Sequence, residues 1–376
     1  MNTIEKIKIL GESSKYDLCA SSASKRKPKT NDRIGSPISC GVCQSFTPDG
    51  RCVSLFKTLM TNQCSYDCKY CMNTSCKRKQ DVEFNPEELA QTFMKLYMKN
   101  YVEGLFLSSG VKRADPDKTT ENMIEAVRLI RDKYKFHGYV HFKAIPGVNR
   151  DLLKQASEYA DRISINLEAP NKSRLSSITD VKTYKSDILR RQSWIKRLDV
   201  PSGQTTQMVV GSTDESDKEI LKMMKWEYEN IELRRMYFSA FEAIPGTKLE
   251  KHPNTPMQRE VRLYNSDWLH RIYDYKMNEI YDVLDENGNL PKEDPKIAIA
   301  RNYFDSPIDV NEASYQELMH VPGIGPTSAA RIMNLQESKQ RLTKSSELKN
   351  IGVVLKRAIP FLDINNCNQR TLGVYA

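Results

Sequence analysis

Three cysteines stand close together in the chain. Three residues separate Cys64 from Cys68, and two separate Cys68 from Cys71. As thiolates, side chains at this spacing can wrap one face of a cubane iron–sulfur cluster and ligate three of its irons. The fourth iron then has no protein ligand, which is what a chelating small molecule requires. The spacing therefore predicts a [4Fe–4S] cluster that binds a cofactor.

A zinc site is the alternative interpretation of these cysteines, with Cys76 or an upstream cysteine as the fourth ligand. Zinc sites usually hold two Cys-x-x-Cys pairs apart by a longer loop. Here the three cysteines follow directly on a predicted strand and precede a series of strand–helix repeats. That setting favours the cluster over zinc.

Further cysteines lie upstream. The chain has 9 cysteines, and all but Cys19 and Cys367 fall between residues 40 and 76. In a cytoplasmic chain such residues are more often metal ligands, reactive thiols or core residues than disulfides. Cys40 and Cys43 form a Cys-x-x-Cys pair ahead of Cys52. A zinc site or an auxiliary cluster is one interpretation, and buried or free thiols are the other.

The elements that must position the cysteine triad form a strand–helix repeat. Six short apolar runs alternate with amphipathic stretches, which favours a parallel sheet covered by helices. The expected strands are 55–60, 104–107, 139–142, 162–167, 206–210 and 235–238, and the expected helices are 86–100, 120–134, 150–159, 186–197 and 215–228. The count predicts an α/β fold, a partial (β/α)6 barrel, because a closed eight-stranded barrel needs two more units.

The flanking segments differ in character, which predicts four regions. Residues 1–53 read as an irregular N-terminal extension with a Cys-rich loop, and residues 54–254 hold the barrel core. Residues 255–304 are expected to be a helical connector. Residues 305–376 form a small all-α module.

The C-terminal module contains a helix–hairpin–helix motif. Asn311–His320 is expected to be a helix capped by Asn311, followed by a tight turn at Val321–Pro326 and a second helix at 327–335. A weaker second copy spans residues 345–361. Glycines in the turn allow positive φ and expose backbone N–H groups that can hold a phosphate. The residues expected to contact DNA are Gly323, Ile324, Gly325 and Thr327.

Charge and hydropathy agree with a nucleic-acid partner. The 376-residue chain has a formal net charge of +9, which suits a polyanion. The mean hydropathy of −0.60 and the lack of a long apolar run argue against a membrane span. The charged N-terminus, Met1–Leu10, does not read as a secretory signal, so we expect a cytoplasmic protein.

The Cys-x-x-x-Cys-x-x-Cys spacing, with Tyr70 before the last cysteine, resembles the radical S-adenosylmethionine (SAM) superfamily. The resemblance implies that the methionine part of SAM binds the open iron. It also implies that an electron from the cluster breaks the S–C5′ bond and yields a 5′-deoxyadenosyl radical, which abstracts hydrogen from the substrate.

The resemblance also implies cofactor contacts at the carboxyl ends of later strands, where ligands bind in parallel α/β folds. A Ser-Ser-Gly turn follows the second strand, polar residues end the fourth, and a Gly-containing turn ends the fifth. The expected cofactor-binding residues are Ser108, Ser109, Gly110, Ser164, Asn166, Glu168 and Gly211. Ordinary turn and capping chemistry is the alternative for each.

Two further polar residues, His141 and Lys143, share one face of the third expected strand. Inside a barrel they need partners. A role toward substrate and a purely structural pairing are both open, and no catalytic residue is singled out.

The order of features resembles one family in particular, the DNA modification/repair radical SAM proteins with a C-terminal helix–hairpin–helix. Its marks are Lys15–Asp17 with Cys19, Ser45–Cys52, the triad, Glu103–Gly110 and Val321–Pro326. The resemblance implies a DNA base or lesion as substrate, and an electron donor and a uracil-DNA-glycosylase-like protein as partners. It makes Cys19, Cys43 and Cys52 the better candidates for a second metal site.

Two other functions remain open at this point. One is a radical SAM enzyme that acts on RNA or on a partner protein. The other is a non-catalytic, zinc-stabilised DNA-binding protein on an inactive barrel.

Overall fold

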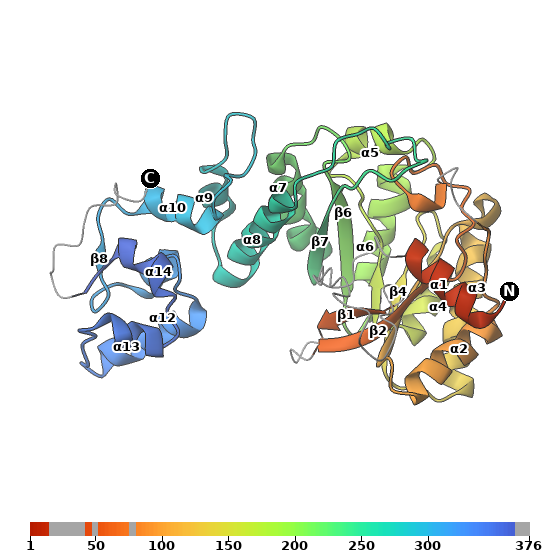
Figure 1. The fold of residues 1–376 in the computed structure, drawn as a ribbon, viewed down its shortest axis with the longest axis horizontal. Coiled ribbons are helices and arrows are strands. Elements are labelled where there is room, and N and C mark those ends of the chain that lie inside the picture. Colours follow the sequence, from red (N-terminus) through yellow and green to blue (C-terminus); the bar gives the residue numbers. More distant parts are fainter. Residues whose placement is uncertain (15–41, 47–51, 75–79, 365–376) are drawn as a thin grey trace, which may run out of the picture. The chain divides into compact units, whose positions relative to one another are not determined.

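The computed structural model describes residues 1–14, 42–46, 52–74 and 80–364 (Figure 1). Cys19, Cys40, Cys76 and Cys367 lie outside these residues. The chain divides into two compact units: residues 1–215 with 222–256, and residues 216–221 with 257–376.

The first unit is built on a seven-stranded sheet whose strands follow one another in chain order. Six of them are parallel and curl into a half-barrel, so the predicted fold class is confirmed (Figure 1). The parallel strands are β2 (Cys52–Leu59), β3 (Gly104–Ser108), β4 (Tyr139–Lys143), β5 (Arg162–Ser164), β6 (Gln204–Val210) and β7 (Arg235–Ala240). All five residues of β3 are buried, as expected for a strand covered on both faces.

Helices cover the outer face of this half-barrel. They pack in chain order, α2 against α3, α3 against α4, and α4 against α6. The main helices are α2 (Pro86–Met98), α3 (Pro116–Arg128), α4 (Arg150–Tyr159), α6 (Arg190–Lys196) and α7 (Asp217–Trp226), with the shorter α5 at Lys172–Ile178. The side chains of Asn85, Asp115 and Asn149 accept hydrogen bonds from the first turns of α2, α3 and α4, which fixes where each helix begins.

Two helices run on into π-helical turns, η3 (Leu129–Lys133) after α3 and η5 (Glu227–Ile231) after α7, and η4 (Tyr184–Leu189) leads into α6. Short 3-10 turns, η1 (Met72–Thr74) and η2 (Lys112–Ala114), follow the cysteine triad and β3. The expected helices 120–134, 186–197 and 215–228 are therefore each made of an α and a π segment.

The N-terminal region is more ordered than expected. Helix α1 (Thr3–Ser13) starts at a capping box in which Asn2 and Glu5 exchange hydrogen bonds. The Lys6 ammonium lies 2.6 Å from the Glu88 carboxylate of α2, which fixes α1 against the core. Strand β1 (Val42–Phe46) pairs antiparallel with β2. The expectation of an irregular extension over 1–53 was thus wrong for these two segments.

The second unit is helical, apart from the short pair of strands β8 (Ile308–Asp309) and β9 (Leu362–Asp363). Its helices are α8 (Met257–Tyr273), α9 (Met277–Tyr281), α10 (Pro295–Tyr303), α11 (Tyr315–His320), α12 (Pro326–Glu337), α13 (Ser345–Asn350) and α14 (Leu355–Ala358), followed by the 3-10 turn η6 (Ile359–Phe361). Ala300 and Phe304 at the end of α10 share one core with the hairpin helices. Part of the expected connector therefore packs together with the C-terminal module.

The start of the first hairpin helix differs from expectation. The helix is capped by Ser314, whose hydroxyl accepts from the Glu317 N–H in a capping box. The Asn311 side chain instead bonds Asp309 and the Leu342 carbonyl. The predicted cap was wrong because Ser314 stands three residues before Glu317, the spacing that lets both groups satisfy backbone N–H donors.

None of the described helices is both long and apolar enough to cross a bilayer.

Candidate active site at the carboxyl ends of the strands

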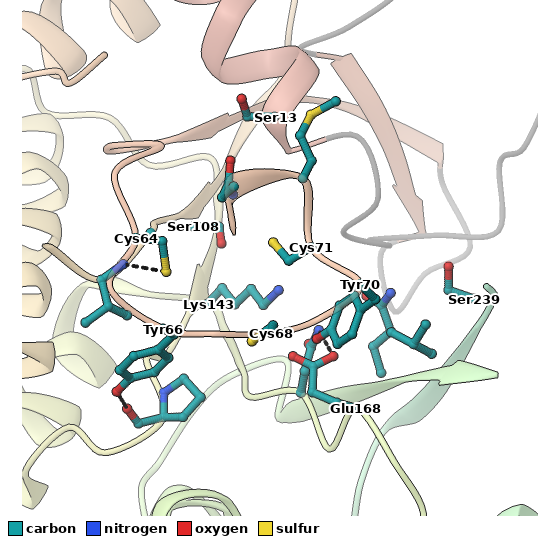
Figure 2. A pocket seen from close by; sticks show the side chains of 18 of the residues that line it. Ser13, Cys64, Tyr66, Cys68, Tyr70, Cys71, Ser108, Lys143, Glu168 and Ser239 are labelled. Carbon is teal, nitrogen blue, oxygen red and sulfur yellow. Dashed lines mark hydrogen bonds between the residues drawn. The ribbon is translucent and has the colours of Figure 1, made fainter. Parts of the chain in front are cut away.

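A cavity of about 140 Å³ opens at the carboxyl ends of the parallel strands. All three cysteines of the triad line it, together with residues from the ends of β3 to β7. Figure 2 shows Cys64, Cys68 and Cys71 spaced around it, with the Lys143 side chain between Cys68 and Cys71 in this view. The cavity therefore lies where ligands bind in parallel α/β folds.

The cysteine loop is tied to the end of β3. The Ser65 N–H donates to the Val111 carbonyl at 2.8 Å, and the Val111 N–H lies 3.4 Å from the Cys64 sulfur. The Gly110 N–H donates to the Thr61 carbonyl at 2.8 Å. The turn after β3 therefore fixes the cysteine loop and directs a backbone N–H at the Cys64 sulfur.

The same loop is also fixed on its other side, through Asp67. Its carboxylate accepts hydrogen bonds from the Thr179 hydroxyl at 2.5 Å and the Asp180 N–H at 2.9 Å. Partial burial opposes the charge, but these hydrogen bonds outweigh it and hold the Asp67 pKa below its ordinary value. The loop that carries the cysteines is thus held between β3 and the segment after α5.

The thiols of Cys68 and Cys71 are in a poor environment for negative charge. Burial, and then negative charge on Cys68, raise the pKa of Cys71 to about 12. Burial likewise raises the pKa of Cys68, against the attraction of Lys182. A coordinated iron stabilises the thiolate form of a cysteine, which burial in the protein disfavours here. Metal binding would therefore supply the stabilisation that these thiolates need.

Glu168 is held in a strained conformation on the cavity wall. Its φ is +66°, in the left-handed region that few residues other than glycine adopt. Its N–H donates to the Gln207 carbonyl at 3.0 Å, and its carbonyl accepts from the Val209 N–H at 2.9 Å. Pairing with β6 therefore holds the strained residue and directs its carboxylate into the cavity.

The Glu168 carboxylate meets three polar groups there. The Lys182 ammonium lies at 3.2 Å, the Asn166 amide at 3.4 Å, and the Tyr70 hydroxyl also bonds to it. Lys182 also faces Cys68. Burial opposes its charge, but Cys68 and Glu168 raise its pKa above the ordinary value. One side of the cavity thus carries a buried ion pair beside a cysteine.

The expected cofactor contacts divide into two groups. Ser108, Ser109, Gly110, Asn166 and Glu168 all line the cavity with the three cysteines. A Cβ on Gly110 would lie 2.3 Å from the Gln63 carbonyl oxygen, so the turn and the cysteine loop approach at a distance that only glycine permits.

The other two expected contacts do not line this cavity. Ser164 is buried in the barrel, where its hydroxyl lies 2.8 Å from Nε2 of His141. Gly211 ends β6 with φ +79°, and its N–H donates to the Glu215 carboxylate. Ser164 and Gly211 thus make contacts of the structural and turn kind, and their predicted contact with the cofactor stays a prediction.

His141 and Lys143 also separate. Burial lowers the pKa of His141 well below its ordinary value, and positive charge on Arg162 and Lys143 adds to this. The imidazole packs edge-on against Phe106 with ring centroids 4.5 Å apart. His141 is thus a neutral barrel residue, whereas Lys143 lines the cavity.

The sequence reasoning missed several residues that line the cavity: Lys182, Gln207, Ser239 and Glu242. Gln207 shares a strand face with Val209, and Ser239 and Glu242 lie at the end of β7. Strand-end position was a usable signal for Ser239 and Glu242, and alternation with Val209 was the signal for Gln207. Lys182 lies in a loop after α5, and no local pattern marks it.

The expected second metal site falls partly outside the described residues, because Cys19 is not among them. Cys43 lies on β1 and Cys52 begins β2. Among the residues that the structure describes, no three metal-binding side chains converge on a single ion. The triad thiols instead stand around the rim of the cavity (Figure 2).

The hairpin turn of the second unit adopts a backbone suited to phosphate. Gly323 has φ +91°, and its carbonyl accepts from the Val354 N–H of the second hairpin at 2.9 Å. Gly325 caps α12 without a side-chain acceptor. The predicted residues Gly323, Ile324, Gly325 and Thr327 border one cavity of this unit.

A [4Fe–4S] cluster with SAM fits the first cavity. Three thiols line it from one loop, one of them has a backbone N–H donor, and polar side chains line the same cavity. Cys64, Cys68 and Cys71 would hold three irons, which leaves the fourth without a ligand from the triad.

Comparison with known families agrees with a site for a [4Fe–4S] cluster and SAM. The sequence model of the radical SAM superfamily matches residues 58–226, and that of the helix-hairpin-helix motif matches residues 305–358. Members of this superfamily bind a [4Fe–4S] cluster and SAM. No curated protein matches the chain.

Solved structures similar to the chain include the FeFe-hydrogenase maturase HydG from Carboxydothermus hydrogenoformans, with 11% identity and a TM-score of 0.45 over 57% of this chain and 50% of that one. Methylornithine synthase (PylB) has 13% identity and a TM-score of 0.47 over 57% and 61%. The cobalamin-dependent SAM radical enzyme OxsB has 12% identity and a TM-score of 0.34 over 75% and 45%. The chain thus spans about half to three fifths of these proteins.

The family model matches residues 58–226, which include the cysteine triad that lines the cavity at the strand ends. The first unit therefore holds a radical SAM superfamily domain, and the second unit carries a helix-hairpin-helix motif.

Proposed function

We propose that this protein is a radical SAM enzyme that acts on DNA, either modifying a base or repairing a lesion. The observation that carries the proposal is the presence of a helix-hairpin-helix motif in the same chain as the cysteine-lined cavity. Such motifs grip the nucleic-acid backbone without reading bases. The net charge of +9 supports a polyanionic partner.

Cys64, Cys68 and Cys71 would hold the cluster, which with SAM would supply the one-electron chemistry needed to abstract hydrogen from a substrate. The chain's own residues position and shield the reactants. The Ser108–Gly110 turn offers hydroxyl and carbonyl groups to the methionine amino group. Glu168, held by Lys182 and Asn166, offers a fixed carboxylate. Ile145 and Ile244 add apolar wall that limits water in the cavity.

DNA would be held through backbone N–H groups at the hairpin turns. Gly323 and Gly352, with φ of +91° and +95°, give the two turns the backbone that exposes such donors. The residues proposed to contact phosphates in the first turn are Gly323, Ile324, Gly325 and Thr327. A target base inside a duplex must be extruded before a radical can reach it, at a cost of roughly a few kcal/mol.

The decisive experiment quantifies 5′-deoxyadenosine from the anaerobically reconstituted full-length protein with reductant and SAM. It is run without polymer, with double-stranded DNA and with tRNA. Cys71→Ala is the control for cluster-dependent chemistry. Product that depends on Cys71 and is stimulated by DNA supports the proposal, whereas stimulation by tRNA alone would assign the enzyme to RNA.

Metal analysis of the same preparation tests the non-catalytic alternative. About four irons with matching sulfide per chain are expected. Zinc without sulfide, and no 5′-deoxyadenosine under any condition, would contradict the enzyme assignment. A Cys43→Ser variant reports on the proposed second site with Cys19 and Cys52: it lowers metal content below the wild-type value only if that site exists.

A further inference from the structure

A second cavity, of about 440 Å³, lies within the second unit beside the hairpin turn. Helix α8 contributes Trp268 and Tyr273, the start of α10 contributes Lys296, and the two hairpins contribute Gly325 and Arg357. Its volume is within the range of small-ligand sites in proteins. The cavity therefore brings aromatic, cationic and backbone N–H groups together in one place.

One wall is aromatic. Trp268 lines the cavity and is 47% exposed, although indole rings are usually well buried. Tyr273 packs closely against the turn, because a Cβ on Gly325 would lie 2.9 Å from its hydroxyl oxygen. An exposed indole face is a platform on which any nucleobase can stack.

A buried cation lies beside the aromatic wall. Lys296 is only 5% exposed, and among the described residues its ammonium has one hydrogen-bond acceptor, the Ile324 carbonyl at 2.6 Å. The ammonium also lies 4.5 Å from the centre of the Tyr273 ring. It has three N–H donors, of which Ile324 takes one, so it can also donate to a ligand. Burial, with Arg357 nearby, lowers the pKa of Lys296 to about 7. An anion in the cavity would restore its charge.

Arg357 and the start of α12 add further donors. The Arg357 guanidinium binds the Asp294 carboxylate at 2.6 Å, while its buried Nε has no hydrogen-bond partner among the residues that the structure describes. Gly325 provides no side-chain cap for α12, so the N–H groups of Thr327 and Ser328 have no acceptor from the cap residue. Uncapped N–H groups beside a buried cation form a site for a phosphate.

An indole ring, a buried ammonium and helix N–H groups in one cavity together indicate which class of ligand it would bind. A phosphate alone makes no use of the indole face, and an apolar ligand makes no use of Lys296. A nucleotide carries both groups, an aromatic base and an anionic phosphate. We propose that this cavity holds an unpaired nucleotide of DNA, with its base stacked on Trp268 and its phosphate at Lys296 and the start of α12. The inference rests on the proposed action on DNA and adds a preference for DNA with a displaced base.

The test measures binding of the full-length protein to three duplexes: one fully paired, one with a single unpaired nucleotide, and one with an abasic unit at the same place. Wild type should bind the unpaired-nucleotide duplex about tenfold more tightly than the other two, the size of effect expected for stacking of one base. Trp268→Ala should abolish the preference, and Trp268→Phe should retain most of it. Trp226→Ala is the matched control, since Trp226 is also exposed but does not line the cavity.

A fluorescent base analogue at the unpaired position gives a second readout. Its emission should be quenched by wild type and by Trp226→Ala, and should stay unquenched with Trp268→Ala. Equal affinity for the three duplexes, or a preference that survives Trp268→Ala, would overturn the inference while leaving DNA binding intact. Tight binding of the free mononucleotide without any preference among the duplexes would assign the cavity to a small-molecule ligand instead. Failure to bind any duplex would contradict the proposed function itself.

Discussion

The Glu168 carboxylate and the Lys182 ammonium lie 3.2 Å apart with side chains only 8% and 7% exposed. The pair joins the strained residue Glu168, in the segment after β5, to the loop after α5, beside Cys68 of the triad. Both charges are therefore out of water on the wall of the cavity proposed to hold SAM.

Because the two charges are buried together, we expect loss of either one alone to lower the stability of the protein. Lys182→Met should destabilise the protein by about 3–5 kcal/mol, because it leaves Glu168 buried without its partner. The double variant with Glu168→Gln should recover much of that loss. Chemical denaturation of the two single variants and the double variant gives the coupling free energy. A coupling near zero would show that the two charges act independently.

The close contact at Gly110, between the Ser-Ser-Gly turn and the cysteine loop, leads to a second prediction. A methyl group in Gly110→Ala would lie 2.3 Å from the Gln63 carbonyl oxygen, so one of the two segments must move. We expect lower iron content after reconstitution and at least about a tenfold drop in SAM cleavage, because small misplacement of reacting groups is costly. Ser157→Ala on α4 is the control. Normal iron content and normal cleavage in Gly110→Ala would contradict the close approach.

Glu227 predicts a pH dependence of stability. It is fully buried, and burial raises its pKa from 4.5 to about 8, against a hydrogen bond from Gln192. The folded state therefore binds the proton more tightly than the unfolded state. Its contribution to stability is complete below pH 4.5 and is lost as the pH rises toward 8.

Glu227→Gln removes this titration while keeping an acceptor for Gln192. The variant should be close to wild type at pH 5 and more stable by about 1–3 kcal/mol at pH 8. Denaturation curves of both proteins across this range give the difference directly. Parallel pH profiles for the two proteins would show that Glu227 does not titrate in this window.

Substitution of Gly323 should impair DNA binding by the second unit and leave cofactor cleavage unchanged. Alanine at φ +91° is strained by about 1–2 kcal/mol, and its Cβ would lie 2.5 Å from the Val354 carbonyl oxygen. Gly323→Ala should weaken binding of paired duplex DNA by about tenfold, since the turn can no longer present its N–H groups. Cofactor cleavage without DNA should match wild type. Ser338→Ala, at the exposed end of α12, is the control, and equal DNA affinity for both variants would exclude the turn as the contact.

Local sequence was sufficient to predict the helices, the strands and the loop that carries the three cysteines. Alternating apolar runs and capping residues such as Asn85 identified the six parallel strands and the main helices, because these signals act over a few residues. Cys64, Cys68 and Cys71 were identifiable because all three come from one loop of eight residues. The hairpin turn could be predicted for the same reason, because its glycines lie close together in the sequence.

Only the tertiary structure decided which distant side chains share the cavity. Lys182 meets Glu168 and Cys68 through a loop with no pattern of its own, and Ser164 turns to His141 instead of the cavity. Strand β1 forms by pairing with β2, and Trp268 becomes part of the hairpin cavity by packing of α8. Each of these depends on contacts between residues far apart in the chain. Periodicity and spacing report only on neighbours. The fold, the triad and some polar residues at strand ends could therefore be predicted from sequence, whereas the Glu168–Lys182 pair and the second cavity could not.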